Sequence, residues 1–533
     1  MLIDGLPLDA PAAPLADLLR LGLDAGPDEV ALLSADRSLT WAELEAESAA
    51  LAGGYRALGL APGDRLASLM PNRNDLVVHY LACFKAGLVA TPLNYRYTHR
   101  EIDHALEVSG ARALLAHAER FEDVGASRLA AELPLGAIAY ADGDAPGVGE
   151  AVSGGAWSHD FAGLLAAAPL PPDPAPADPS DPAAIFFTSG STGPAKGVTH
   201  TRESLRWMVA SAAAAFELSD DDVFLPGSSM SHIGSFLWVL STLSVGGRVV
   251  VARTIDSHEL LPLLREQRPT VLAMIPAALL ALVRDHDLQP HDFDSLRICR
   301  AGSDKVSTEL LTEFAAAAGF PIVEGYGMTE VGLATLNPPS GVVKQGSIGT
   351  PIGGFSIALR DEGGEPVEAE DVVGRIWIRT RSRMAGYWEA PEATAEILRD
   401  EWLDSGDLAR ADADGYLWFF GRKKQVIVHD GSNISPYEVE GALNEHPAIA
   451  LAGAVGVHDA VHGENVRAYV TLREGAEPPG SGDLIVFCRE RIGYKAPEEI
   501  VFLEEMPLNP TGKIDRVGLK RMAEDHLHPH GLD

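Results

Sequence analysis

Apolar residues recur at helical spacing in the segment 38–60. Thr40 precedes Glu43 by three residues, which is the spacing of a capping box, and Gly59 follows as a helix terminator. The apolar positions that define the buried face are Leu44, Ala49, Leu51, Tyr55 and Leu58. Their spacing near three and four predicts an amphipathic helix.

Short apolar runs then alternate with helical patterns. We expect strands at 66–70 and 88–92, separated by a helix at 74–86 that ends at Gly87. A proline-rich connector at 169–182 precedes the apolar strand Ala183–Phe187. This alternation predicts an α/β fold in which a large region of several subdomains layers sheets against helices.

The pattern changes beyond residue 420. The expected elements are strands at 425–428 and 466–472 and helices at 436–444 and 482–492. They predict a small α+β domain of about 110 residues, an ordinary size for an independent unit. We therefore expect a large domain over residues 1–423 and a small mobile domain over 424–533.

Composition narrows the functional classes. A chain of 533 residues is too long for one hydrophobic core, and 46% hydrophobic with 22% charged residues is typical of a globular protein. The formal net charge of −34 disfavours nucleic acids and anionic membrane surfaces, because both are polyanions. A nucleotide remains possible, since a local loop can hold phosphate.

The chain carries no sign of secretion. Its three cysteines, Cys83, Cys299 and Cys488, lie far apart among apolar neighbours, which predicts buried thiols in a reducing compartment. The N-terminus lacks the basic start of a signal peptide, and no run of about 18 apolar residues predicts a membrane span. A cytoplasmic location and no membrane span are the expectation.

A glycine- and hydroxyl-rich segment follows the strand at 183–187. It reads Thr188-Ser-Gly-Ser-Thr-Gly-Pro-Ala-Lys196-Gly197. Its glycines permit backbone N–H groups to converge, and its hydroxyls and Lys196 suit a triphosphate. It is not a P-loop, because no Gly-Lys-Ser/Thr triplet ends it; from composition alone a flexible polar turn stays open.

This segment resembles the phosphate loop of the adenylate-forming, or AMP-binding, superfamily, and in particular its acyl-CoA synthetases and aryl-acid CoA ligases. Further motifs follow in the family's order and extend the resemblance over nearly the whole chain. They are Gly325-Tyr-Gly-Met-Thr-Glu330, Ser405-Gly-Asp407, Gly421-Arg422-Lys-Lys424 and Asn509-Pro-Thr-Gly-Lys513. The resemblance implies an enzyme that converts a carboxylic acid and ATP into acyl-AMP and pyrophosphate.

The resemblance also implies roles for residues around ATP. Tyr326 would face adenine, Thr329 would donate to the α-phosphate, and Glu330 would hold Mg²⁺, which prefers carboxylate and phosphate oxygens. Asp407 would accept the ribose hydroxyls, and Arg422 would support it. The full nucleotide set is Thr188, Ser189, Gly190, Ser191, Thr192, Gly193, Gly302, Ser303, Gly325, Tyr326, Gly327, Met328, Asp407, Phe419 and Arg422.

Catalysis is expected to depend on Lys513, with Lys196, Thr329 and Glu330. In-line attack brings two anions together, and a cation delivered by the small domain lowers their repulsion. Lys424 is the expected hinge about which that domain rotates before thiol attack, with Gly431 lining the thiol tunnel.

The acid pocket is expected at His232, Ile233, Gly234 and Gly327. Amino-acid-activating relatives place an aspartate in the segment that contains His232, and its absence here disfavours an α-amino acid. A core histidine is the structural alternative for His232. Gly327 stands where acetate-specific relatives carry tryptophan, which predicts a pocket for a medium-to-large apolar or aromatic acid.

The expected acceptor is coenzyme A, giving acyl-CoA and AMP. Gln425 and His429-Asp430 depart from the common family form, which keeps a carrier-protein phosphopantetheine open as the thiol. A luciferase-like oxidase and a non-catalytic nucleotide-binding protein are the remaining alternatives. As partners we expect the acid, ATP and CoA, with an acyl carrier protein as an option, no nucleic acid, and a monomer or homodimer.

Overall fold

The computed structural model describes residues 1–142, 157–171, 178–188, 195–302, 306–367, 369–429, 432–459, 462–509 and 513–527. Helix α2 (Trp41–Ala57) begins at the capping box in which Thr40 and Glu43 bond reciprocally, and α3 (Asn74–Ala86) ends at Gly87 in the left-handed conformation. Both predictions from the sequence are confirmed.

Two α/β sheets form most of the large region. The first has the order β20-β10-β9-β5-β4-β6-β7-β8 and the second β17-β16-β15-β14-β13-β11-β12-β2-β3. The first sheet comprises Gly386–Tyr387, Lys196–Thr201, Pro182–Thr188, Val89–Pro92, Arg65–Leu69, Ala113–His117, Ala137–Tyr140 and Trp157–Asp160. The second comprises Thr350–Pro351, Gly332–Leu336, Val323–Met328, Ile298–Ala301, Val271–Met274, Val223–Gly227, Arg248–Val250, Val30–Leu33 and Ser38–Thr40.

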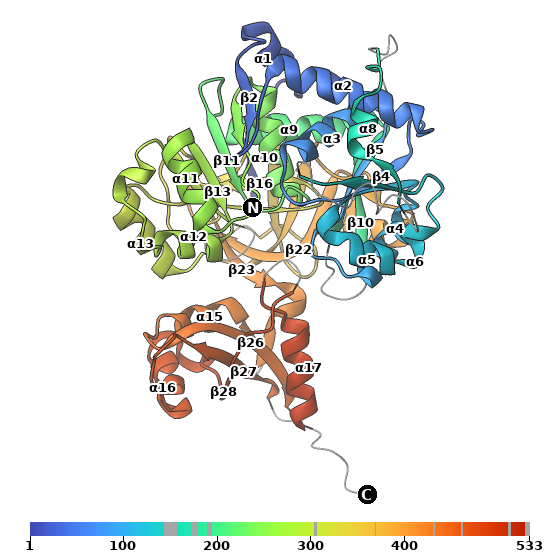
Figure 1. Cartoon of the computed structure of the whole chain (residues 1–533). Helices are drawn as coiled ribbons and strands as arrows, with labels where there is room; N and C mark the ends of the chain where they lie inside the picture. The colour runs from blue at the N-terminus through green and yellow to red at the C-terminus, as the bar shows by residue number, and fades with distance from the viewer. Residues whose placement is uncertain are drawn as a thin grey trace, which may run out of the picture.

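Helices cover both sheets and separate them. Helices α2, α3, α9 (Arg202–Ala215) and α10 (Ile233–Ser244) share one core with the inner faces of the two sheets. The outer face of the second sheet carries α11 (Ser257–Gln267), α12 (Pro276–Val283) and α13 (Thr308–Ala318), and that of the first α4 (His99–Ser109), α5 (Phe121–Ala126) and α6 (Arg128–Ala131) (Figure 1). The short helices α1 (Arg20–Ala25) and α8 (Phe161–Leu165) lie beside α2. The predicted layered α/β class is confirmed.

A third, antiparallel sheet closes the large region. Its strands are β1 (Leu2–Asp4), β18 (Phe355–Arg360), β19 (Gly374–Thr380), β22 (Trp402–Ala411), β21 (Leu398–Arg399) and β23 (Leu417–Arg422), with α14 (Pro391–Ile397) beside them. Strand β23 lies at the junction with the C-terminal elements (Figure 1).

The C-terminal elements form a sheet and cores of their own. The order β25-β24-β27-β26 places Ser432–Ile434, Ile427–His429, Gly463–Leu472 and Ile449–Asp459 side by side, and β28 (Glu499–Phe502) pairs with β27. Helices α15 (Pro436–Asn444), α16 (Ser481–Ile492) and α17 (Arg516–Leu527) complete this part. The strand expected at 425–428 begins later, because Lys423–Gln425 form a 3-10 turn first.

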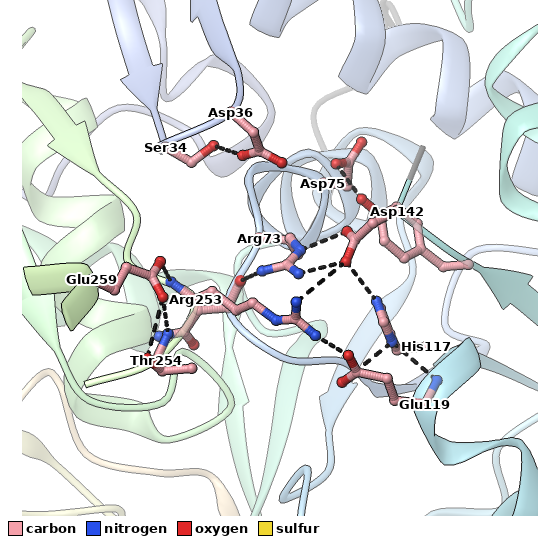
Figure 2. Close-up of polar contacts among 12 residues, drawn as sticks. Ser34, Asp36, Arg73, Asp75, His117, Glu119, Asp142, Arg253, Thr254 and Glu259 are labelled. Carbon is pink, nitrogen blue, oxygen red and sulfur yellow. Dashed lines mark hydrogen bonds and ion pairs between the residues drawn. The ribbon is translucent and has the colours of Figure 1, made fainter. Parts of the chain in front are cut away.

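Ion pairs connect the two large sheets in a cluster that we call the sheet joint, defined as Arg73, His117, Glu119, Asp142 and Arg253 (Figure 2). Arg73 donates to both oxygens of Asp142, at 2.7 and 2.5 Å, and His117 Nε2 lies 3.3 Å from the same carboxylate. Arg253 enters from the second sheet and pairs with Glu119. The Arg73 hydrogen bond holds the pKa of Asp142 below its ordinary value.

The three cysteines are free and buried, as predicted. None of the described helices is both long enough and apolar enough to cross a membrane.

Candidate active site

Glu330 lies in the turn between β15 and β16, at the end of the motif that was singled out for magnesium. Its side chain is buried, and its Oε1 accepts a hydrogen bond of 2.9 Å from the Tyr387 hydroxyl. Burial raises the pKa of Glu330, and the Tyr387 bond opposes that rise. The Met384 N–H fixes the backbone by donating to the Glu330 carbonyl at 2.8 Å. A carboxylate held in this way has the oxygen chemistry that Mg²⁺ takes alongside phosphates.

Lys196 and Thr329 lie near the same turn. Lys196 Nζ sits 4.9 Å from the centroid of the Tyr387 ring, which also contacts Glu330 through its hydroxyl. The buried His200 lies with Nε2 2.8 Å from the Thr329 carbonyl, so Nε2 carries the donated proton. Burial lowers the pKa of His200 to about 4, so this histidine is neutral at physiological pH. Strands β10 and β20 thus bring Lys196 and Tyr387 to the Glu330 turn.

Thr188 is the last residue of β9 and precedes the glycine- and hydroxyl-rich loop. Several predicted binding residues lie outside the described residues. They are Ser189, Gly190, Ser191, Thr192, Gly193, Ser303 and Gly431.

Asp407 stands on β22 within a buried polar group. Its Oδ2 accepts a 2.6 Å hydrogen bond from the Tyr326 hydroxyl, and its Oδ1 lies 3.4 Å from Arg422 Nε on the paired strand β23. Burial raises the pKa of Asp407, while Arg422, Tyr326 and Lys513 oppose that rise. A carboxylate has about four lone-pair positions, so two ribose hydroxyls can still share it. The Tyr326 ring lies against Phe419, with centroids 6.1 Å apart.

Lys513 reaches this group from the C-terminal part of the chain. Its charge contributes to lowering the pKa of Asp407 and that of His232, so it lies within electrostatic range of both. The loop that carries it is closed by reciprocal bonds, because Asn509 N–H donates to the Lys513 carbonyl at 2.7 Å and Lys513 N–H to Asn509 Oδ1 at 3.0 Å. The structure therefore brings a C-terminal cation within electrostatic range of a carboxylate of β22 and of the start of α10.

Three of the four residues singled out for acid binding lie where α10 begins, and the fourth, Gly327, lies on β15. His232 is the N-cap of α10, and Ile233 and Gly234 form its first turn. Burial, with a further contribution from Lys513, lowers the pKa of His232 to about 4, so the ring is neutral at physiological pH. A Cβ at Gly327 would lie 2.3 Å from the Gly332 carbonyl oxygen, so the β15–β16 pairing itself requires glycine there.

The link between the two parts of the chain is exposed at Lys424, within the 3-10 turn Lys423–Gln425. Around it, Phe419 of the large region contacts Tyr437 of α15, with ring centroids 5.5 Å apart. Arg473 forms a 2.9 Å ion pair with Glu309 at the start of α13. His429 Nδ1 lies 2.7 Å from the Glu464 carbonyl and its ring stacks on His462, which fixes the start of the altered loop.

Residues 22–388 match the family described as AMP-binding enzyme, and residues 438–513 match the AMP-binding enzyme C-terminal domain. The chain belongs to this family.

Two relatives illustrate the similarity in sequence. The chain is 34% identical to a feruloyl-CoA synthase of Amycolatopsis sp over 93% of its own length and 96% of the relative. It is 33% identical to the fatty acid–[acyl-carrier-protein] ligase ScoC of Streptomyces coeruleorubidus, over 93% of each.

A solved family member gives the same result for the fold. MatB from Rhodopseudomonas palustris with ATP bound superimposes with a TM-score of 0.86, at 26% identity, over 96% of this chain and 99% of MatB. The apo form of MatB gives a TM-score of 0.76. The arrangement of this AMP-binding family member is thus closer to the ATP-bound form, in agreement with the position of Lys513 beside Asp407.

Three residues around this site escaped the sequence analysis. Tyr387 and His200 fix Glu330 and Thr329, but each is far from its partner in sequence, so no local motif signals the contact. The third is Arg300 of β14, two residues before Gly302, where an arginine within an apolar strand was the available signal.

Proposed function

We propose that this enzyme, an AMP-forming acid–CoA ligase, uses the group around Glu330, Asp407 and Lys513 to activate a carboxylic acid. The acid carboxylate attacks the α-phosphorus of ATP, giving acyl-AMP and pyrophosphate. The thiolate of CoA then attacks the acyl carbon, giving acyl-CoA and releasing AMP.

The observation that carries the proposal is the position of Lys513. The same lysine acts on Asp407, assigned to the ribose, and on His232, assigned to the acid. A cation that acts on both residues supports a role for Lys513 in offsetting the repulsion of two anions when the attacking carboxylate meets the α-phosphate. Thr329 and Lys196 are assigned to phosphate oxygens, and Phe419 and Tyr326 to the nucleoside.

Glu330 is the residue we assign to Mg²⁺, which would draw charge from the leaving pyrophosphate when bound. The buried carboxylate is oriented by Tyr387, so its remaining oxygen lone pairs have a fixed direction.

We assign residues 1–423 to an ATP- and acid-binding domain and 424–533 to a mobile domain that supplies Lys513. The separate sheets and cores of the two parts and the exposed turn at Lys424 support rotation there between the two half-reactions. Gly431 is assigned to the thiol tunnel on the resemblance alone.

The acid class follows from what surrounds α10. His232 is neutral and stands where an amino-acid-activating relative would carry an aspartate, so an α-ammonium would have no anionic partner from this segment. We therefore propose a carboxylic acid that is not an α-amino acid, and we assign it a medium-to-large apolar or aromatic body on the resemblance alone.

A carrier-protein thiol is the second candidate acceptor, since ScoC, at 33% identity, is named as an [acyl-carrier-protein] ligase. Pyrophosphate exchange and steady AMP release, measured over a panel of acids with CoA or with a phosphopantetheinylated carrier protein, test both. AMP release that requires CoA supports the ligase; release only with the carrier protein supports the alternative; no acid-dependent exchange with any acid contradicts the adenylation step.

A further inference from the structure

Arg300 is an arginine inside the second sheet, on the face that α10 covers. Strand β14 pairs Arg300 with Ala273 on one side and with Val323 on the other. The side chain is 7% exposed, and its guanidinium carbon lies 5.4 Å from the ring centroid of Trp238 on α10. This cation therefore sits between an apolar strand surface and an indole.

No hydrogen bond or ion pair joins Arg300 to any residue in the described part of the chain, and its Nε is a buried donor without an acceptor there. Every other charged side chain buried in the described ranges has such a partner. These are Arg73, Asp75, Arg202, Asp222, Asp292, Glu324, Glu330, Asp404, Asp407, Glu440 and Arg467. Burial alone lowers the pKa of Arg300 to about 10, so the group stays charged at physiological pH.

An isolated buried charge is costly, because it has lost its hydration without gaining a partner. A buried charge without a protein partner is one signature of a functional site. The Trp238 face offsets part of the cost, since a guanidinium over an indole is attracted to the ring. The five N–H donors of the guanidinium remain for an acceptor that the described residues do not supply.

The location of the guanidinium connects Arg300 to the acid. A Cβ on Gly302 would lie 2.4 Å from Arg300 Cζ, so the guanidinium lies directly over this glycine, which the resemblance assigns to nucleotide binding. A Cβ on Gly234, in the first turn of α10, would lie 3.7 Å from Trp238 Nε1. Arg300 and Trp238 thus adjoin two glycines assigned to the binding region.

We propose that Arg300 binds a second anionic group, a carboxylate or a sulfonate, at the far end of the acid substrate. The inference rests on the proposed function and specifies its substrate class: an acid with an apolar or aromatic body and an anion at each end. A guanidinium accepts such groups through two parallel N–H···O bonds, which fix the direction as well as the charge of the ligand.

The length of the acid follows from α10. His232 is the N-cap of α10, where the acid is expected to bind, and Trp238 on the same helix stands beside Arg300. The two positions are separated by roughly 9 Å of helical rise. The second anion is therefore expected several bonds from the reacting carboxyl, as in adipate or a carboxyphenylacetate, and further than in malonate.

The proposed site should discriminate between dianionic and monocarboxylate substrates, because leaving the buried Arg300 guanidinium without an acceptor is costly. A monocarboxylate of the same body desolvates the region further and leaves Arg300 without an acceptor, whereas the dianion satisfies it. Sites built to bond a polar substrate group reject analogues that lack the group, because their own buried partners are left unsatisfied.

The test compares matched acids that differ only in the distal group. The pairs are adipate with hexanoate and 4-carboxyphenylacetate with phenylacetate, and 4-sulfophenylacetate separates a sulfonate from a carboxylate. Acid-dependent pyrophosphate exchange gives kcat/KM for each acid, and thermal shift with ATP gives binding without turnover. We expect kcat/KM to favour the dianion by at least about tenfold, the effect of a hydrogen bond to a charged group.

Three variants assign that preference to a residue. Arg300→Met removes the charge at similar volume and should abolish the preference and the dianion-dependent thermal shift. Arg300→Lys keeps charge without the fork and should retain part of it. Arg202→Met is the matched control, since Arg202 is equally buried but donates to the Phe84 carbonyl, and it should leave the preference unchanged.

A preference for monocarboxylates, or a dianion preference that survives Arg300→Met, would overturn the inference while leaving adenylation intact. The absence of exchange with every acid contradicts the proposed function instead. In that case a dianion-dependent thermal shift that Arg300→Met abolishes would still support the anion site, and no such shift would overturn it too.

Discussion

Arg73 and Arg300 are buried to the same degree, at 8% and 7% exposure, in opposite electrostatic surroundings. Arg73 belongs to the sheet joint, where the carboxylates of Asp142 and Glu119 meet the guanidinium groups of Arg73 and Arg253. Arg300 faces an indole and has no acceptor in the described part of the chain. A buried charge in the joint stabilises the fold, whereas the one near the acid region is available for a ligand.

The catalytic lysine gives the largest expected contrast with the joint. Lys513→Ala should reduce acid-dependent pyrophosphate exchange by about 10²-fold or more, because it removes a charge expected to stabilise the transition state. Its melting temperature should stay within error of the wild type. Lys520→Ala is the control, since Lys520 lies on α17 in the same domain and pairs with Glu464 at 3.3 Å. Full exchange activity in Lys513→Ala would contradict the assignment.

The joint should respond in the opposite way. Asp142→Ala leaves Arg73 and His117 without their shared acceptor and should lower the free energy of unfolding by about 2–3 kcal/mol, the range for hydrogen bonds to charged groups. Urea denaturation measures this loss, and kcat/KM of the folded protein should hold. Asp414→Ala, at an exposed ion pair with Lys344, should cost less than about 1 kcal/mol. Equal losses in the two variants would remove the distinction.

Arg300→Met should shift stability in the reverse direction. Replacing a buried cation that lacks a protein partner by an apolar side chain of similar volume removes a desolvation cost, so unfolding should become harder by about 1 kcal/mol, or stay unchanged. The melting temperature without ligands measures this effect. A clear fall in the melting temperature would show that Arg300 stabilises the fold as Arg73 does, which would contradict the distinction drawn between the two arginines.

The smallest effect concerns pH. Burial raises the pKa of Asp407, so its carboxylate protonates at a higher pH than an ordinary aspartate as the solution is acidified. The ionised form accepts the ribose hydroxyls; KM for ATP should therefore be flat at alkaline pH and rise several-fold as acidification protonates Asp407, at a higher pH than an ordinary aspartate would require. His232 and His200 have pKa values of about 4 and are neutral above that pH. Burial also raises the pKa of Glu330, so both carboxylates contribute to the acid limb. Asp407→Asn should raise KM and remove the part of the pH dependence that belongs to Asp407.

The sequence predicts those parts of the fold that are determined by residues close together in the chain. Local signals predicted α3 and α15 to the residue, because Gly87 and Pro436 mark their ends, and predicted the capping box at Thr40. The strand at 425–428 was misplaced because a 3-10 turn, formed where the chain crosses between two sheets, has no composition that separates it from a strand.

The residues of the candidate site also fall into those that a sequence motif indicates and those that only the structure shows. Motif resemblance singled out Glu330, Asp407 and Lys513, which the structure brings into one region. It could not indicate Tyr387 or His200, since their roles arise from contacts between strands distant in sequence. Arg300 could not be singled out from the sequence either. Only its three-dimensional surroundings show that this arginine in a strand has no partner in the described part of the chain.

The position of the Arg300 guanidinium over Gly302 makes residue 302 a second control on where this charge lies. A Cβ at 302 would lie 2.4 Å from Arg300 Cζ, within the space of the guanidinium. A Gly302→Ala change would therefore displace the charge without touching residue 300, because the flexible end of the arginine has to move away from the added methyl group.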